Sequence, residues 1–232
     1  MFDCATELQE RITQYYREMI LGSAFSKLSE FVENPKQITV KVKLSDTIES
    51  EPLELGELLR HTAEFSAGVT ELFQIKAIAA WNDYLNNVFR FLLHAQLHGG
   101  PQVLDYSFKL NLKLISSLPD IEKQATRDYS FERYIERVRL LKKGVPQAAG
   151  DGPLQVELKL IRKHVEIRNS LQHHNGIVTR ALLNDLGSDK LALLDANGKV
   201  LNIGEGDRIM LYIPELNFLK QAIYRVSRTW AP

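Results

Sequence analysis

Residues 53–97 form the longest apolar-rich stretch of the 232-residue chain, and they constrain its fold more than any other segment. Apolar residues recur in this stretch at the spacing of one helical face, which is typical of a packed helix. The positions that mark this face are Leu72, Ile75, Ile78 (or Ala79), Asn82, Leu85 and Phe89. The stretch predicts one long helix, or two helices broken near Gly68, with an end at His98-Gly99-Gly100-Pro101.

The rest of the chain is also mostly of helical character. Apolar periodicity predicts helices over residues 4–31, 103–118, 120–143, 154–174 and 215–229. Alternation over residues 38–44 predicts a strand. Short apolar segments between residues 190 and 213 are separated by Asn197-Gly198 and Gly204-Glu205-Gly206, which predict a small β-hairpin or meander. We expect a mainly α bundle in one domain, with residues 1–52 as an N-terminal extension packed on a core bundle of residues 53–232.

Composition and the single cysteine indicate in which cellular compartment the chain is expected to act. With 44% hydrophobic residues the chain can bury a substantial core. Cys4 cannot form an internal disulfide, the acidic N-terminal segment is unlike a signal peptide, and no apolar run reaches the roughly 18 residues of a membrane span. We therefore expect a cytoplasmic protein without membrane contact.

A balanced charge limits how the chain could hold nucleic acid. The formal net charge is zero, so an RNA contact would need a local basic patch. Residues 131–143 offer the best candidate, and we predict RNA contacts for Arg133, Arg137, Lys142 and Lys143. The alternative for such a charged run is an ordinary solvated helix face.

Residues 154–174 form the best-defined helix in the sequence. Leu154, Leu158, Ile161 and Val165 fall within a narrow arc of the helical wheel, and Arg168 occupies the next position on that stripe. A second apolar stripe contains Val156, Leu160, Ile167 and Leu171. A helix with two apolar faces is expected to be sandwiched, in mid-bundle or against a partner chain. Asn175-Gly176 predicts its end.

Arg168, Asn169 and His173 bring three polar groups to the end of this helix. An unpaired buried guanidinium is costly, so Arg168 should be paired or should line a cavity. Asn169 and His173 share a face, and unwinding at Asn175-Gly176 would let His173 swing toward Arg168. Arginine binds phosphate bidentately and histidine transfers protons near neutral pH, so the set suits phosphate chemistry.

The run from Glu166 to Val178 resembles the signature of the HEPN superfamily, in which an arginine precedes a histidine by four to six intervening residues and asparagine often follows the arginine. Trp81-Asn82-Asp83-Tyr84-Leu85 is similar to an earlier element of such domains, but Asn82 stands where an acidic residue is expected and Asp83 lies beside it. The segment from Gly204 to Trp230 is similar to the hairpin and last helix of one prokaryotic branch.

The resemblance implies an all-helical bundle that dimerises and a ribonuclease that needs no metal or other cofactor. Arg168 would stabilise a phosphorane, His173 would act as general acid or base and Asn169 would orient the groups, with Asp83 and His174 as possible supporting residues. Members of this family act in toxin–antitoxin and other defence systems, so RNA, a second copy of the chain and an antitoxin or defence partner are the expected partners. The alternative function is a non-catalytic dimeric module that binds RNA, a nucleotide or a protein.

Each candidate also has a simpler interpretation. Arg168 could form a structural salt bridge, Asn169 an ordinary hydrogen bond, and Asp83 could be an exposed helical carboxylate. Adjacent histidines on a helix diverge by about 100°, which disfavours a metal pair at residues 173 and 174. His174 fits the alternative motif spacing and could replace His173, whereas His164 is expected to be a core or edge histidine.

Overall fold

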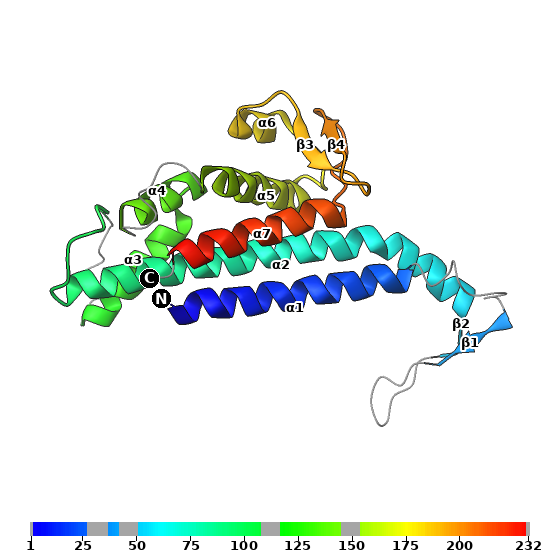
Figure 1. The fold of residues 1–232 in the computed structure, drawn as a ribbon, viewed down its shortest axis with the longest axis horizontal. Helices are drawn as coiled ribbons and strands as arrows, with labels where there is room; N and C mark the ends of the chain where they lie inside the picture. Colours follow the sequence, from blue (N-terminus) through cyan, green and yellow to red (C-terminus); the bar gives the residue numbers. More distant parts are fainter. Residues whose placement is uncertain (1, 27–36, 42–50, 108–116, 145–153, 231–232) are drawn as a thin grey trace.

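The computed structural model describes residues 2–26, 37–41, 51–107, 117–144 and 154–230 (Figure 1). Its central element is α2 (Leu55–Leu97), a single helix of 43 residues. It passes Gly68 without a break, so the first of the two sequence-based alternatives for this stretch is confirmed. The helix ends where the sequence predicted, with His98 as its C-cap.

Helices α1 (Phe2–Ser26) and α7 (Ile213–Trp230) lie side by side with α2, although they come from opposite ends of the chain (Figure 1). Trp81 of α2 and Trp230 of α7 are fully buried, with ring centroids 6.1 Å apart. Gln9 Nε2 donates a 3.0 Å hydrogen bond to Ser227 Oγ between α1 and α7. The N-terminal helix therefore contributes to the same core as the residues that follow it.

The charged segment predicted as one helix over residues 120–143 is two helices, α3 (Leu118–Phe131) and α4 (Tyr134–Gly144). The break occurs because Glu132 adopts an extended backbone conformation, with φ −65° and ψ 152°. Pro119 lies in the first turn of α3, where its missing N–H costs nothing, instead of ending a preceding helix. The helix predicted over 103–118 is wrong for residues 103–107, which are irregular, and residues 108–116 lie outside the described part.

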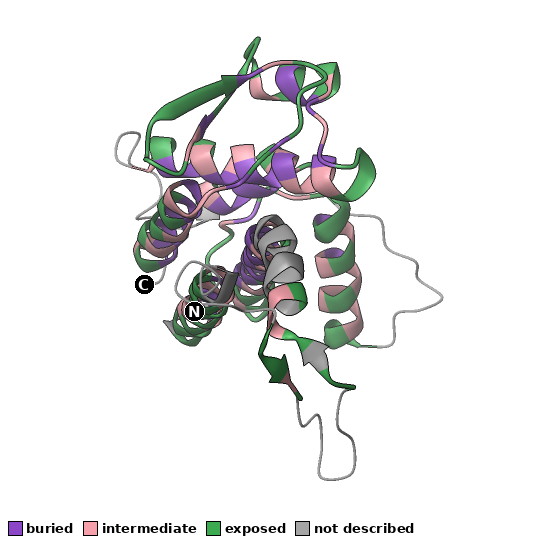
Figure 2. Cartoon of the chain, turned by 90° about the vertical axis from the view of Figure 1, so that its right-hand side faces the viewer, coloured by how far each residue is buried: buried purple, intermediate pink, exposed green. Residues whose placement is uncertain are grey.

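Helix α5 (Gln155–His173) lies between two layers, as its two apolar stripes predicted. The α2–α7 pair lies beneath it in Figure 1, and a short helix α6 (Arg180–Leu186) with strands β3 (Leu191–Leu194) and β4 (Val200–Ile203) lies above it. From the side, buried residues gather between these layers while exposed residues cover the outer surfaces (Figure 2). Elements of the same chain thus occupy both faces of α5.

The β structure is small. Strands β3 and β4 form an antiparallel hairpin in which Leu191 pairs with Ile203. The third strand of a meander does not form, because Arg208 makes only an isolated bridge to Ile177, so the hairpin alternative is the observed one. Strands β1 (Thr39–Val40) and β2 (Leu53–Glu54) form a second two-stranded pair. The strand predicted over 38–44 is seen only as β1, since residues 42–50 lie outside the described part.

The described residues form a mainly α fold with these small β elements. None of their helices combines the length and the apolar character that crossing a membrane requires.

Candidate functional site

The end of α5 is held in a defined left-handed turn. Asn175 and Gly176 have φ values of 52° and 71°, which glycine adopts freely and asparagine tolerates better than most residues. The Gly176 N–H donates a 3.1 Å hydrogen bond to the Ser170 carbonyl, and Ser170 Oγ donates a 2.6 Å bond to the Ile177 carbonyl. These bonds fix the backbone where α5 ends.

Arg168 lies on the buried stripe of α5, one turn beyond His164 and Val165. The residue is half-buried, and its Nε atom is buried without a hydrogen-bond partner. Among the described residues, no carboxylate forms an ion pair with its guanidinium. The alternative in which Arg168 forms a structural salt bridge therefore finds no carboxylate partner among the described residues. The guanidinium is available to an anion supplied by another molecule.

Asn169 is half-buried beside Arg168, and its Nδ2 donates a 3.3 Å hydrogen bond to Glu166 Oε2. Burial raises the pKa of Glu166 and the charge of Asp185 adds to this, while the Asn169 hydrogen bond and the charge of Arg162 oppose it. The amide is thereby oriented by a neighbour one turn earlier on the same helix.

His173 and His174 are both exposed. Because α5 stays helical through His173, the unwinding expected to bring His173 toward Arg168 begins only after it. Positions 168 and 173 are then about 140° apart around the helix axis, whereas positions 169 and 173 are about 40° apart. Within one chain the helix therefore brings Asn169 and His173 to one face and leaves Arg168 on another.

Asp83 has a partner elsewhere. Its Oδ2 lies 3.1 Å from Arg11 Nη2 in an exposed ion pair that joins α1 to α2. Asp83 was expected to support Arg168, but among the described residues no hydrogen bond or ion pair joins the two. An ion pair with this exposure stabilises the fold by about 0–1 kcal/mol.

Arg137, one of the four predicted RNA contacts, is buried. Its Nη1 donates a 2.9 Å bond to Asn82 Oδ1, and its Nη2 donates 3.0 Å and 3.2 Å bonds to Asn86 Oδ1 and the Asn82 carbonyl. The guanidinium also lies over the Tyr129 ring, 5.0 Å from its centroid. The residue joins α4 to α2, so an RNA backbone cannot reach it without disrupting the core.

The other three residues of the predicted patch are more accessible. Arg133 is exposed and Lys142 is half-buried. Lys143 is exposed, with its Nζ 3.5 Å from Asp105 Oδ2. Asn82, which stands where the HEPN-like pattern has an acidic residue, accepts hydrogen bonds from Arg137 instead.

His164 was expected in the core or at its edge, and it is fully buried. Its Nε2 lies 3.1 Å from Glu215 Oε1, and Lys163 Nζ lies 2.5 Å from the same oxygen. Glu215 Oε2 accepts a 2.9 Å bond from the Leu194 N–H, which joins α7 to β3. Sequence reasoning did not find Glu215, because no fixed spacing links two residues that are 51 positions apart.

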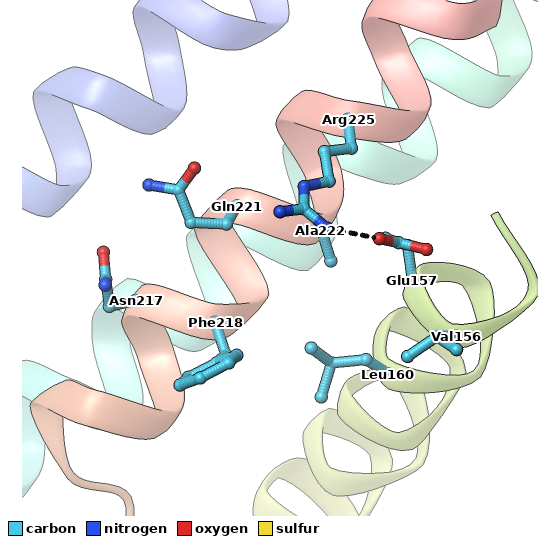
Figure 3. Close-up of a pocket in the computed structure, with 8 residues that line it drawn as sticks. All are labelled: Val156, Glu157, Leu160, Asn217, Phe218, Gln221, Ala222 and Arg225. Carbon is cyan, nitrogen blue, oxygen red and sulfur yellow. Dashed lines mark hydrogen bonds and ion pairs between the residues drawn. The ribbon is translucent and has the colours of Figure 1, made fainter. Parts of the chain in front are cut away.

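A groove lies between the first half of α5 and α7 (Figure 3). Arg225 Nη1 donates a 2.9 Å bond to Glu157 Oε1 along its wall, and the exposed side chains of Val156 and Phe218 flank it. The groove is mostly apolar and lies at the opposite end of α5 from His173. It contains none of the predicted catalytic residues.

The chain was compared with protein-family models, with curated proteins and with solved structures, and none of the three comparisons gave a match.

Proposed function

We propose that the chain is a HEPN-type, metal-independent endoribonuclease that acts as a homodimer. In this proposal Arg168 stabilises the phosphorane, His173 is the general acid or base and Asn169 orients the reacting groups. The proposal rests on the motif in the sequence and on one structural observation: Arg168 is half-buried, with a buried Nε that has no hydrogen-bond partner in the part of the chain that the structure describes. An arginine in such a place is stabilised when an anion binds, and a phosphate offers matching bidentate acceptors.

A second copy of the chain completes the proposed site. Because positions 168 and 173 diverge on one helix, Arg168 of one protomer and His173 of its partner would act on the same phosphate. Their separation on the wheel, about 140°, supports a shared site more than a site within one chain. The exposure of His173 leaves its imidazole accessible to the substrate and to the partner.

The proposed reaction is internal transesterification of RNA. The 2′-hydroxyl oxygen forms a bond to the adjacent phosphorus while a histidine accepts its proton, and the bond from phosphorus to the 5′-oxygen breaks. The leaving oxygen takes a proton from an imidazolium, which gives a 2′,3′-cyclic phosphate and a 5′-hydroxyl. Arg168 stabilises the charge that develops on the phosphorane oxygens.

Arg133, Lys142 and Lys143 are the proposed contacts for the RNA backbone, and Arg137 is not among them because it is buried. A cytoplasmic defence or toxin–antitoxin role, with an antitoxin or defence protein as a further partner, remains part of this proposal.

The test is RNA cleavage in EDTA by the purified wild type and by Arg168→Ala and His173→Ala. Wild-type cleavage that persists in EDTA and falls at least 100-fold in both variants supports the proposal. Arg228→Ala, an exposed arginine on α7, is the matched control and should retain wild-type activity. His174→Ala decides which of the two adjacent histidines acts.

Complementation tests the shared site. Co-expressed Arg168→Ala and His173→Ala chains form mixed dimers in which one of the two sites keeps both groups, so cleavage should return to a fraction of the wild-type rate. Equal RNA cleavage by wild type and both variants, or none by any of them, would overturn the enzymatic proposal.

A non-catalytic dimeric module that binds RNA, a nucleotide or a protein is the second candidate. The observation that favours it is that Asp83, the carboxylate expected to support Arg168, is paired with Arg11 instead. Retention of RNA by wild type with loss in Arg168→Ala, and no cleavage by either, would support this module.

A further inference from the structure

The last turn of α2 and the first half of α3 bring two imidazoles and a carboxylate together on the surface. His94 lies in the last turn of α2 and His98 is the C-cap residue that follows the helix, and their ring centroids are 4.0 Å apart. Glu122 of α3 places Oε1 2.7 Å from His94 Nδ1. One ligand atom from each of the three residues lies within 4.8 Å of the others.

We propose that His94, His98 and Glu122 bind a divalent transition-metal ion of the Zn²⁺ type. Two imidazole nitrogens and one carboxylate oxygen form a ligand set that zinc accepts, with water at the fourth position. Ligand atoms at about 2.1 Å from a tetrahedral ion lie roughly 3.4 Å from one another, so Glu122 and His94 would separate by under 1 Å from their present contact. This site is independent of the proposed ribonuclease, which uses none of these residues.

The orientation of His98 is the second observation that supports a metal. Its Nδ1 lies 2.8 Å from the His94 carbonyl oxygen, which can only accept, so Nδ1 carries the proton. In the neutral ring the lone pair is then on Nε2, where it can bind a metal ion. Metal-binding histidines are typically oriented in this way, with the second ring nitrogen donating to a backbone carbonyl.

The positions of the three residues also favour a metal over a simple ion pair. The Glu122 side chain is only 15% exposed, so its surroundings restrict the carboxylate. The His94 side chain is 58% exposed, so its ring can adjust to a bound ion. His98 is fixed at the C-cap, where its N–H donates a 3.1 Å bond to the His94 carbonyl. A bound ion would join the end of α2 to α3 across the connection that contains residues 99–117.

Titration of the metal-free full-length protein with Zn²⁺ alone tests the site by calorimetry. We expect one ion per chain for the wild type, and at least a tenfold loss of affinity in His94→Ala, His98→Ala and Glu122→Ala. His174→Ala, which removes an exposed histidine at the end of α5, is the matched control and should bind as the wild type does. Mg²⁺, which prefers oxygen ligands, should give no binding.

Thermal unfolding gives a second readout that does not depend on heats of binding. Zn²⁺ should raise the Tm of the wild type and of His174→Ala but not that of His94→Ala or His98→Ala. Because all three ligands are at or near the surface, circular dichroism of the metal-free variants should match the wild type.

Three outcomes would overturn the proposal. They are absence of Zn²⁺ binding by the wild type at about 100 µM, binding that survives the double variant His94→Ala/His98→Ala, and a stoichiometry of one ion per two chains. The ribonuclease assay is run in EDTA, so neither result depends on the other.

Discussion

His164 of α5 and Glu215 of α7 form a buried pair, with His164 Nε2 3.1 Å from Glu215 Oε1. The carboxylate oxygen accepts, so Nε2 carries the proton and Nδ1 is left buried without a partner. Burial lowers the pKa of His164 and the Glu215 contact opposes this. Burial alone would raise the pKa of Glu215, but its bonds with His164 and Lys163 and their charges lower it to about 2. Since His164 is neutral near pH 7, Lys163 supplies the positive charge there.

Acid should destabilise the protein in two ranges. Below pH 6.5 His164 takes up a proton more readily in the unfolded chain than in the folded chain, where its pKa is lowered. The stability that is present above pH 6.5 is therefore lost as the pH falls. Below about pH 4.5 the unfolded chain protonates Glu215 before the folded chain does, so its contribution is lost as the pH approaches 2. Urea unfolding of wild type and His164→Gln at pH 7.5 and 5.5 measures the first effect.

The variant should lose less stability than the wild type between these two pH values. His174→Gln, an exposed histidine, should follow the wild type. An unchanged pH dependence in His164→Gln would show that this pair does not control stability in that range.

Glu215→Gln at pH 7 should reduce the free energy of unfolding by about 3 kcal/mol. The substitution removes the charge that balances Lys163 and weakens the acceptor of the Leu194 N–H. Glu18→Gln removes one exposed carboxylate on α1 and should cost less than about 1 kcal/mol. Equal losses in the two variants would contradict this account of Glu215.

Arg168→Met should increase the free energy of unfolding by about 1 kcal/mol, because it replaces a half-buried cation that has no ion-pair partner among the described residues by an apolar side chain of similar length. The gain in stability should accompany the loss of RNA cleavage under the proposed function. Arg228→Met should change the stability by less than about 0.5 kcal/mol. A loss of stability in Arg168→Met would mean that the guanidinium does find a partner.

Arg137→Ala should reduce the free energy of unfolding by about 3 kcal/mol, because it removes a buried guanidinium and leaves the partly buried Asn82 and Asn86 without their donor. Arg133→Ala, on the exposed side of the same region, should cost less than about 0.5 kcal/mol. Chemical denaturation of both variants measures the contrast. Similar costs would argue against a structural role for Arg137.

Gly176→Ala should reduce the free energy of unfolding by about 1–2 kcal/mol, because a side chain at φ 71° is strained and its Cβ would lie 3.2 Å from Leu171 Cδ2. Gly198→Ala is the matched control: its φ is 75°, but its Cβ would meet nothing within 4 Å, so only the strain remains. Thermal unfolding compares the two, and an equal decrease would show that contact with Leu171 is unimportant.

Periodicity predicted the helical elements well where the surroundings agree with the local pattern. The limits of α5, and its end at Asn175-Gly176, follow from side-chain spacing and from the left-handed turn that these two residues allow. The split at Glu132 could not be predicted in this way, because both flanking segments have helical sequences and only the backbone conformation separates them.

The candidate site was less accessible to sequence reasoning. Wheel geometry placed Arg168 correctly on a buried stripe, but the partners of Asp83 and Arg137 are contacts between helices distant in sequence. Such contacts leave no periodic signal within a single segment. The Glu122 contact of His94 was missed for the same reason, because only the fold brings α3 to the end of α2.

The packing of Trp230 against Trp81 has a consequence for how the chain acquires its structure during synthesis. Helices α1 and α2 are neighbours in sequence and can associate as soon as both have left the ribosome. The part of α2 that packs against Trp230 cannot be covered by it until α7 has been made roughly 130 residues later. During that interval the apolar contact between α2 and α7 is missing and the nascent chain is more vulnerable to aggregation, so translation speed and chaperone access should influence the yield of folded protein.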